Sequence, residues 1–254
     1  MHPTYDFRER VVCVTGAGRG IGLAMTAAFS AAGAAVCVND IDADSADQVA
    51  AELRRGGHDA LAFVADVADP AGVGELFAAI DARWGRIDVL INNAGIEPVH
   101  SLFDHPLADW QRTLDVNLTA AFLCTQQAAR RMRDQGGGVI LNIASIAGKS
   151  QPLYLRAAYA ASKAGLVGFS KEAAREFAAH QIRVNAICPG VIITPMTEHL
   201  RHDEAQMARW RGEIPLARLG EAEEVANLAL WLASDAASYI TGAAWHVDGG
   251  KNMA

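Results

Sequence analysis

The sequence predicts an α/β fold, a doubly wound parallel sheet of about seven strands with helices on both faces. Short apolar runs alternate with segments of helical length along most of the chain, which is typical of parallel strands joined by crossover helices. Several runs end in glycine or a polar residue, as strands do at the edge of a sheet. The 254 residues, 51% apolar and 20% charged, suffice for one large core, so we expect a single domain over residues 1–254.

The first expected strand, residues 11–15, is a continuous apolar run, as expected for a strand buried on both faces. It leads into TGAGRGIG, residues 15–22. Glycines let the backbone turn tightly and approach a pyrophosphate, whose charge the N-terminus of a following helix, residues 21–32, would face. Ile21 occupies the third position of the common G-x-G-x-x-G pattern, so a plain tight turn remains the alternative.

The second expected strand, residues 35–39, ends at Asp40, 18 residues after Gly22. This offset suits a carboxylate that binds the adenosine ribose hydroxyls, so Asp40 predicts NAD as the cofactor. Asp40 would repel the 2′-phosphate of NADP, and Asp42 would add to the repulsion. Two alternatives remain, because Asp40 could only cap a turn and Arg19 could reach a phosphate.

The remaining elements of the first half continue the alternation, with helices over residues 43–55 and 73–84 and strands over 60–64 and 89–92. Such alternation predicts right-handed crossovers and a parallel sheet, with ligands beyond the carboxyl ends of the strands. The candidate residues at these ends are Gly16, Asp40, Asp66 and Asn92.

The second half of the chain predicts a long helix or a bent pair over residues 107–135, with Asn117 in its middle. A strand over residues 139–143 follows and leads to Ser145. The later expected elements are a helix over 157–179, a strand over 183–188, a helix opening at Glu221 and a strand over 243–247. Residues 191–212 form an insertion that we interpret as a mobile lid over a ligand site.

Tyr159 and Lys163 lie four residues apart in the helix expected over residues 157–179, and therefore on one helix face. A cation favours the ionised phenol, and at roughly 6 Å and an effective dielectric of about 20 the gain is nearly 3 kcal/mol. We therefore expect Lys163 to lower the pKa of Tyr159. Ser145, fourteen residues before Tyr159, could donate a hydrogen bond to a substrate oxygen. An isolated Tyr-x-x-x-Lys match would more often be a plain helix with a solvated lysine.

Composition and charge exclude several classes of function. The net charge of −7 comes without a basic block, so we expect no nucleic acid and no anionic membrane as partner. The four cysteines lie in apolar segments without paired spacing, and the histidines show no ligand pattern, so we expect no metal. No apolar run reaches the length of a signal peptide or a membrane span, so we expect a cytoplasmic protein.

From about Arg10 to Gly250 the chain resembles the short-chain dehydrogenase/reductase family, whose motifs appear in the family's order as TGAGRGIG, NNAG, YAASK and Pro189-Gly190. The resemblance implies a Rossmann-like fold and NAD-type cofactor binding. It implies four catalytic residues: Asn117, Ser145, Tyr159 and Lys163. It implies cofactor contacts from Gly16, Arg19, Ile21, Asp40, Asp66, Val67, Asn92, Tyr159, Lys163, Ile192 and Thr194. Ala144 stands where many members have a second serine.

The resemblance also implies roles and an assembly. Tyr159 would exchange the substrate proton, Lys163 would bind the nicotinamide ribose, and Asn117 would order a water that relays the proton. Such proteins are usually homotetramers, and the helices from Leu107 and Ala157 would be the contact faces.

The hypothesis from the sequence is an NAD(H)-dependent oxidoreductase that moves a hydride between a secondary alcohol and its ketone. Polar side chains near the expected pocket favour a sugar, a polyol or another polar alcohol, and they are Glu97, His100, Gln151, Tyr154 and His199. Glu97 and the spacing from Ser145 to Tyr159 also resemble glucose dehydrogenases. Met196, Met207 and Trp210 favour instead an apolar alcohol, and ordinary loop packing would explain all eight residues. The alternatives are an NADPH-dependent 3-oxoacyl-carrier-protein reductase and a non-catalytic dinucleotide-binding protein.

Overall fold

The structure, a computed structural model, describes residues 5–149 and 153–253. Seven strands form one sheet in the order β3-β2-β1-β4-β5-β6-β7, and all neighbouring strands are parallel. The strands are β1 (Val11–Thr15), β2 (Ala35–Asp40), β3 (Ala60–Val64), β4 (Val89–Asn92), β5 (Gly138–Ile143), β6 (Ile182–Pro189) and β7 (Ala244–Val247). The predicted doubly wound parallel sheet is confirmed.

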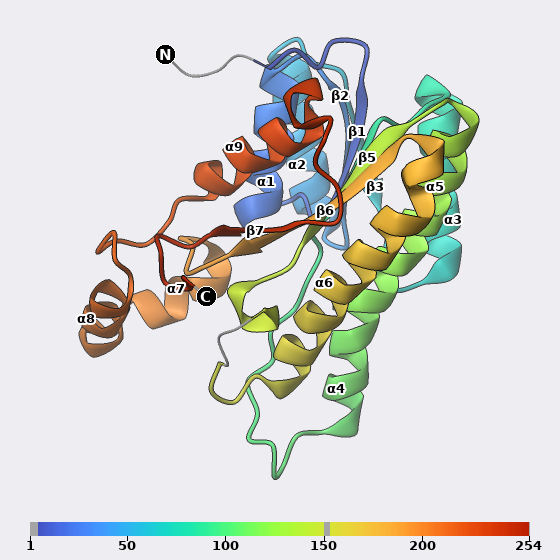
Figure 1. The fold of residues 1–254 in the computed structure, drawn as a ribbon. Helices are drawn as coiled ribbons and strands as arrows, with labels where there is room; N and C mark the ends of the chain where they lie inside the picture. Colours follow the sequence, from blue (N-terminus) through green and yellow to red (C-terminus); the bar gives the residue numbers. More distant parts are fainter. Residues whose placement is uncertain (1–4, 150–152, 254) are drawn as a thin grey trace.

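Helices cover both faces of the sheet (Figure 1). The helices of one face are α1 (Gly20–Ala31), α2 (Ala43–Arg55) and α9 (Ala222–Ala233), and those of the other are α3 (Pro70–Trp84), α5 (Ala120–Asp134) and α6 (Ala157–Phe177). Alternate residues of β1 point to the two faces, so Val12 and Val14 pack in one core while Val11 and Cys13 pack in the other. Burial on both sides explains why the strand is apolar throughout.

Aspartates fix where two helices begin. The Asp69 carboxylate accepts hydrogen bonds from the amides of Ala71 (3.1 Å) and Gly72 (3.3 Å), and Pro70 takes the first helical position of α3. Helix α3 therefore begins three residues before the predicted residue 73. Asp42, predicted to repel a 2′-phosphate, caps α2 by accepting a hydrogen bond from the Ser45 amide at 3.0 Å.

The segment predicted as one long helix or a bent pair is continuous but interrupted by a π-turn. Helix α4 (Leu107–Leu114) passes into the π-turn Asp115–Thr119 and then into α5. Asn117 is buried in this turn. Single π-turns inside helices often mark functional sites, and this one brings Asn117 to the end of the sheet where the strands finish.

Two short helices follow Val191: α7 (Pro195–Arg201) and α8 (Glu204–Glu213), which ends one residue beyond the predicted insertion over residues 191–212. Trp210 packs with Ile214 and Leu219 in a small apolar cluster, against which Met207 also lies. Packing within this cluster accounts for Trp210 and Met207, so they no longer argue for an apolar substrate. No helix in residues 5–149 and 153–253 is long and apolar enough to cross a membrane.

Candidate active site

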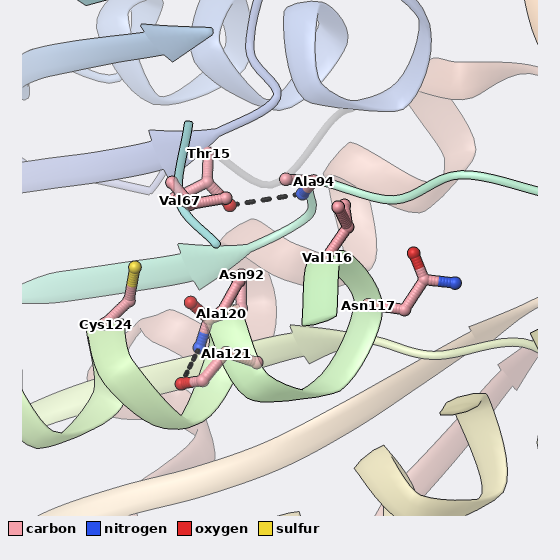
Figure 2. Close-up of a pocket in the computed structure, with 9 residues that line it drawn as sticks. All are labelled: Thr15, Val67, Asn92, Ala94, Val116, Asn117, Ala120, Ala121 and Cys124. Atoms are coloured by element: carbon pink, nitrogen blue, oxygen red, sulfur yellow. Dashed lines mark hydrogen bonds between the residues drawn. The ribbon is translucent and has the colours of Figure 1, made fainter. Parts of the chain in front are cut away.

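The predicted site residues lie at the carboxyl edge of the sheet, where strand order reverses between β1 and β4. Thr15, at the end of β1, joins the two strands: its Oγ1 accepts hydrogen bonds from the amides of Asn93 (3.0 Å) and Ala94 (3.1 Å), the second of which is drawn in Figure 2. The Asn93 side chain donates to the carbonyls of Thr15 and Gly16, both at 2.9 Å. These bonds hold the glycine loop against NNAG, and the role of Asn93 was missed from the sequence.

The glycine loop has the shape that a pyrophosphate needs. Gly16 has a φ of 61°, and a Cβ atom there would lie 2.9 Å from the Ala94 Cα. Exposed Arg19 is the N-cap of α1 and makes no side-chain capping bond, so no cap occupies the amides of the first turn. Ile21, in that turn, packs against the core. These features fit the phosphates of a dinucleotide.

Asp40 lies beside the glycine loop at the end of β2. Its carboxylate accepts hydrogen bonds from the amides of Gly18 (2.9 Å) and Asp42 (3.1 Å). A carboxylate has about four acceptor positions, so capacity remains for ribose hydroxyls. The position predicted for the NAD-determining acid therefore fits an adenosine ribose.

Thr194 closes the loop from the opposite side, because a Cβ atom at Gly20 would lie 3.4 Å from the Thr194 Cβ. Ile192, also predicted to contact the cofactor, has its side chain buried in the core and pairs with Gly220 in an isolated parallel bridge. Any contact from Ile192 would therefore come from its backbone.

The side chains of Asn92 and Val67, two further predicted cofactor contacts, are also buried in the protein interior. The Asn92 Nδ2 donates to Asn142 Oδ1 (2.8 Å) and Thr125 Oγ1 (3.1 Å) inside the protein. Asn92 and buried Val67 line a cavity of about 10 Å³, shown in Figure 2, which is too small for a substrate. Cofactor contact through the Asn92 side chain is therefore not supported, and only its backbone could contribute.

Asp66 lies at the predicted edge, but its carboxylate already has protein partners. It forms an ion pair with Arg112 of α4 at 2.8 Å and accepts a hydrogen bond from the Ala68 amide at 3.0 Å. Arg112 could not be predicted as a partner of Asp66, because the ion pair joins segments far apart in the chain.

The four predicted catalytic residues gather at the ends of β4 and β5. Lys163 is buried, with 4% of its surface exposed, and its Nζ donates to the Ile143 carbonyl at 2.7 Å. The same Nζ lies 5.7 Å from the centre of the Tyr159 ring, as one helical turn predicts. Ser145 begins the short turn Ile146–Gly148, and its hydroxyl lies near enough to the Tyr159 phenol to lower the pKa of that phenol.

The predicted lowering of the Tyr159 pKa is wrong for this structure. Burial of the phenol raises the pKa above its ordinary value, and the nearby Glu97 carboxylate raises it further. The hydrogen bond with Ser145 and the charge of Arg156 lower it, but by less. Burial also lowers the pKa of Lys163 to about 8, so this ammonium is itself destabilised.

Asn117 forms hydrogen bonds with two segments, the loop after NNAG and helix α6. Its Oδ1 accepts from the Ile96 amide (2.8 Å), and its Nδ2 donates to the Ile96 carbonyl (2.9 Å) and to Ser162 Oγ (3.0 Å). Both amide hydrogens are used, which leaves only acceptor positions of Asn117 for the water that the resemblance implies. These hydrogen bonds hold the chain after NNAG against α6.

Glu97, the next residue, forms an ion pair with Arg156 at 2.5 Å. Both side chains are mostly buried, with 16% and 17% of their surface exposed. Burial raises the pKa of Glu97, while the charges of Arg156, His199 and Lys163 lower it. Arg156 was missed from the sequence, although it stands three residues before Tyr159 at the start of the same helix.

The other polar residues predicted near the pocket are only partly supported. His100 pairs with Asp109 at 2.8 Å, and 83% of the Tyr154 surface is exposed. His199 is exposed on α7 but near enough to Glu97 to act on its charge. Gln151 lies outside the described residues. Met196 is exposed on α7.

No group of three or more His, Cys, Asp or Glu within the described ranges could hold a metal ion.

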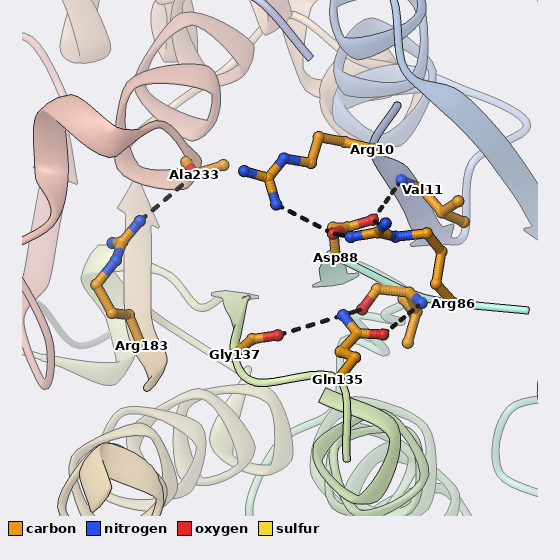
Figure 3. A network of polar contacts seen from close by, with 9 residues as sticks. Arg10, Val11, Arg86, Asp88, Gln135, Gly137, Arg183 and Ala233 are labelled. Carbon is orange, nitrogen blue, oxygen red and sulfur yellow. Dashed lines mark hydrogen bonds and ion pairs between the residues drawn. The ribbon is translucent and has the colours of Figure 1, made fainter. Parts of the chain in front are cut away.

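A second polar network lies at the opposite, amino edge of the sheet (Figure 3). There the buried Asp88 carboxylate binds the Val11 amide (2.8 Å), Arg86 (2.7 Å) and Arg10 (3.2 Å). Arg183 donates to backbone carbonyls at the end of α9. These contacts join backbone segments, so we assign this network to stability.

Comparison with known proteins places the chain among curated reductases and dehydrogenases. A family model described as enoyl-(acyl carrier protein) reductase matches residues 16–252. A 3-oxoacyl-[acyl-carrier-protein] reductase of Synechocystis is 44% identical, with 96% of this chain and 97% of the relative covered. A cis-4-hydroxycyclohexanecarboxylate dehydrogenase of Sinomonas cyclohexanicum is 43% identical over the same two shares. A D-threitol dehydrogenase of Mycolicibacterium smegmatis is 40% identical, covering 98% and 96%.

Solved structures agree with this placement. A short-chain type dehydrogenase/reductase from Mycobacterium marinum superposes with a TM-score of 0.93 at 39% identity, covering 99% of this chain and 98% of the other. A 7α-hydroxysteroid dehydrogenase complexed with NADH has a TM-score of 0.91 at 34% identity, covering 97% and 96%. A structure described as an NAD(P)-dependent gluconate 5-dehydrogenase from Beutenbergia cavernae, with bound NADP, has a TM-score of 0.93 at 38% identity, covering 98% and 99%. From this agreement of sequence, sheet order and motif geometry, the chain belongs to the short-chain dehydrogenase/reductase family.

Proposed function

We propose that the protein is an NAD(H)-dependent oxidoreductase that interconverts a secondary alcohol and its ketone. The observation that carries this proposal is the meeting of the Ser145 hydroxyl and the Lys163 ammonium at Tyr159, beside a glycine loop that fits a dinucleotide. A phenol held between a hydrogen-bond donor and a cation can exchange a proton with a substrate oxygen. Family membership supports oxidoreductase chemistry at CH–OH groups.

In the proposed reaction Ser145 and Tyr159 hold the substrate oxygen. During oxidation the ionised Tyr159 takes the hydroxyl proton while the C–H hydrogen leaves as hydride, and the ketone is the product. The nicotinamide, when bound, supplies the hydride acceptor. The glycine loop and Thr194 would hold its phosphates, Asp40 its adenosine ribose, and Lys163 its nicotinamide ribose.

Removal of the phenol oxygen is the direct test. Tyr159→Phe keeps the packed ring but has no proton to exchange, so we expect turnover to fall at least about 10³-fold. Binding of NADH, followed by its fluorescence, should change by less than about threefold because the cofactor-binding loop is unchanged. Tyr239→Phe, at a fully exposed position, is the control and should keep full activity. Retained turnover in Tyr159→Phe would refute the mechanism.

NAD is the proposed cofactor because Asp40 occupies the ribose end of the glycine loop. We expect NADH to bind at least about tenfold more tightly than NADPH, since a carboxylate repels the 2′-phosphate. Asp40→Ser should shrink this difference by about tenfold or more, whereas Asp47→Ser, on the exposed face of α2, should leave it unchanged. Equal affinities in the unaltered protein would overturn the cofactor assignment.

Two other functions remain in view. The 44% identity to a 3-oxoacyl-[acyl-carrier-protein] reductase favours an NADPH-dependent reductase of that class as the second candidate. The affinities for NADH and NADPH distinguish these two candidates, because an NADPH-dependent reductase must bind NADPH well despite Asp40. A non-catalytic dinucleotide-binding protein would bind cofactor yet show no change in reduced-nicotinamide absorbance with any alcohol or ketone.

A polar alcohol is the proposed substrate class. Glu97 and Arg156 lie near enough to Tyr159 to change the pKa of its phenol, and His199 lies near enough to Glu97 to act on its charge. Met207 and Trp210 are accounted for by packing in their own cluster. Relatives named for D-threitol and for a hydroxycyclohexanecarboxylate support hydroxylated substrates in general. We also propose that the protein is cytoplasmic.

A further inference from the structure

We propose that the Glu97–Arg156 ion pair selects the substrate: Glu97 binds a second hydroxyl close to the reacting carbon and masks Arg156 from substrate carboxylates. The inference rests on the proposed oxidoreductase function and narrows its substrate class to neutral vicinal diols and polyols. Three observations carry it, namely the fixed position of the pair, the acceptor capacity left on the Glu97 carboxylate, and the charge balance beside Tyr159.

The pair is anchored by backbone segments that also position the catalytic residues. A Cβ atom at Gly95 would lie 3.4 Å from Asn117 Oδ1 and 3.5 Å from Lys163 Nζ, so this loop lies directly against both side chains. Two hydrogen bonds from Asn117 to the Ile96 backbone then fix the start of Glu97. On the other side Arg156 is the N-cap of α6, one turn before Tyr159.

The Glu97 carboxylate has acceptor capacity for a ligand. Oε1 lies 2.5 Å from Arg156 Nε, yet this Nε makes no hydrogen bond of acceptable geometry with the described residues, so the carboxylate keeps acceptor positions for a ligand. A partly buried carboxylate oxygen without a donor is unfavourable, and a substrate hydroxyl would supply that donor. The carboxylate lies near the catalytic residues, because Glu97 directly follows the Gly95-Ile96 segment that lies against Asn117 and Lys163, and its charge raises the pKa of Tyr159.

The charges of the pair disfavour other substrates. A substrate carboxylate drawn to Arg156 would meet the negative charge of Glu97 in a mostly buried place, where like charges repel strongly. An apolar substrate would remove the remaining solvent from Glu97 without offering a hydrogen bond. A neutral molecule with adjacent hydroxyls satisfies Glu97 and leaves the ion pair intact.

The test compares three probes that differ in one group: meso-butane-2,3-diol, butan-2-ol and 3-hydroxybutyrate. In the unaltered protein with NAD, kcat/KM should be greatest for the diol. Glu97→Gln should lower the ratio of kcat/KM for the diol over butan-2-ol by roughly 10- to 100-fold, the range of one charged hydrogen bond. The same variant should raise kcat/KM for 3-hydroxybutyrate at least about tenfold, because Arg156 is unmasked. An unchanged diol ratio, or an unchanged value for 3-hydroxybutyrate, overturns the proposal.

A control and a second readout separate this inference from the proposed function. Glu75→Gln makes the same charge change on the exposed face of α3 and should alter none of the ratios. If none of the probes is turned over, dissociation constants are measured in Tyr159→Phe by fluorescence of bound NADH. Tighter binding of the diol than of butan-2-ol, lost with Glu97→Gln, would support the selection even though the proposed reaction had failed, and equal binding would refute it. If Glu97→Gln does not fold, Glu97→Asp takes its place. The ratio of kcat/KM for the diol over butan-2-ol should then fall, but by less than is expected for Glu97→Gln, and an unaltered ratio would refute the inference.

Discussion

Two opposite charges flank Tyr159, and they decide how readily its phenol ionises. Glu97 raises the pKa of Tyr159 and Arg156 lowers it, while burial of the ring raises it most. Burial also lowers the pKa of Lys163 to about 8, which makes its positive charge less favourable than that of an exposed lysine. The acidity of the phenol therefore depends on residues outside the Tyr-x-x-x-Lys motif.

Opposite shifts of the pH profile should follow from changing the two charges. Alcohol oxidation needs the ionised phenol, so the rate rises with pH through the pKa of Tyr159. Glu97→Gln removes a negative charge and should lower this pKa, which moves the rising limb of kcat to lower pH. Arg156→Gln should move the limb to higher pH. Plots of kcat against pH for a substrate that both variants accept would check this, and shifts in the same direction would contradict it.

At the level of single residues, the positions of side chains were predicted from the sequence better than their pKa shifts. Four-residue spacing correctly placed Lys163 beside the Tyr159 ring. The sign of the pKa shift depends on burial and on Glu97, which approaches through a loop from β4, and neither can be seen in local spacing. The engagement of Asn92 with Asn142 was equally hidden, because it joins two strands through the protein interior.

Helices and strands were predicted from the alternation of apolar runs with segments of helical length. The errors arose where a helix cap or a π-turn determines the bounds of an element instead. The missed start of α3 was signalled by Asp69-Pro70, an N-cap followed by proline at the first helical position. The π-turn at Asn117 has no comparable signal, because its geometry is set by the contacts of Asn117 with Ile96 and Ser162. Helices α7 and α8 form most of the insertion expected over residues 191–212.

We propose that residues 191–212 form a lid that cofactor binding orders. Thr194 lies against Gly20 of the glycine loop, so a dinucleotide on that loop would contact the start of α7. NADH should therefore slow proteolytic cleavage within residues 191–212, as measured by mass spectrometry of timed digests. Asp40→Ser, with weaker NADH binding, should show less protection at the same cofactor concentration. Cleavage at an unchanged rate with saturating NADH would count against the lid.

The whole molecule leaves one helical face open between α5 and α6. A groove of about 370 Å³ runs between them, with Phe122 packed edge-on against Phe169 at 6.3 Å between ring centres. Its α5 side carries Arg130 and Arg133, and its α6 side carries Glu172 and Glu176. Two copies related by a twofold axis would bring these opposite charges together around the phenylalanines, as a self-complementary interface requires.

We propose a homotetramer that uses this face, so light scattering should give four times the chain mass of 26.9 kDa. Phe122→Glu would place a charge in the apolar centre of the interface, and we expect it to yield dimers or monomers. Phe103→Glu changes an even more exposed phenylalanine in the loop before α4 and should leave the tetramer intact. A monomer in the unaltered protein would rule out the assembly.

Asp88 is anchored by Arg10, Arg86 and the Val11 amide at one rim of the sheet, while binding and chemistry are proposed at the other. The lengths of β1 and β4 thus separate these contacts from the loops at the carboxyl edge of the sheet. Loop residues such as Glu97 can accordingly be exchanged during evolution, and new substrates acquired, without loss of the contacts that hold the starts of β1 and β4 together.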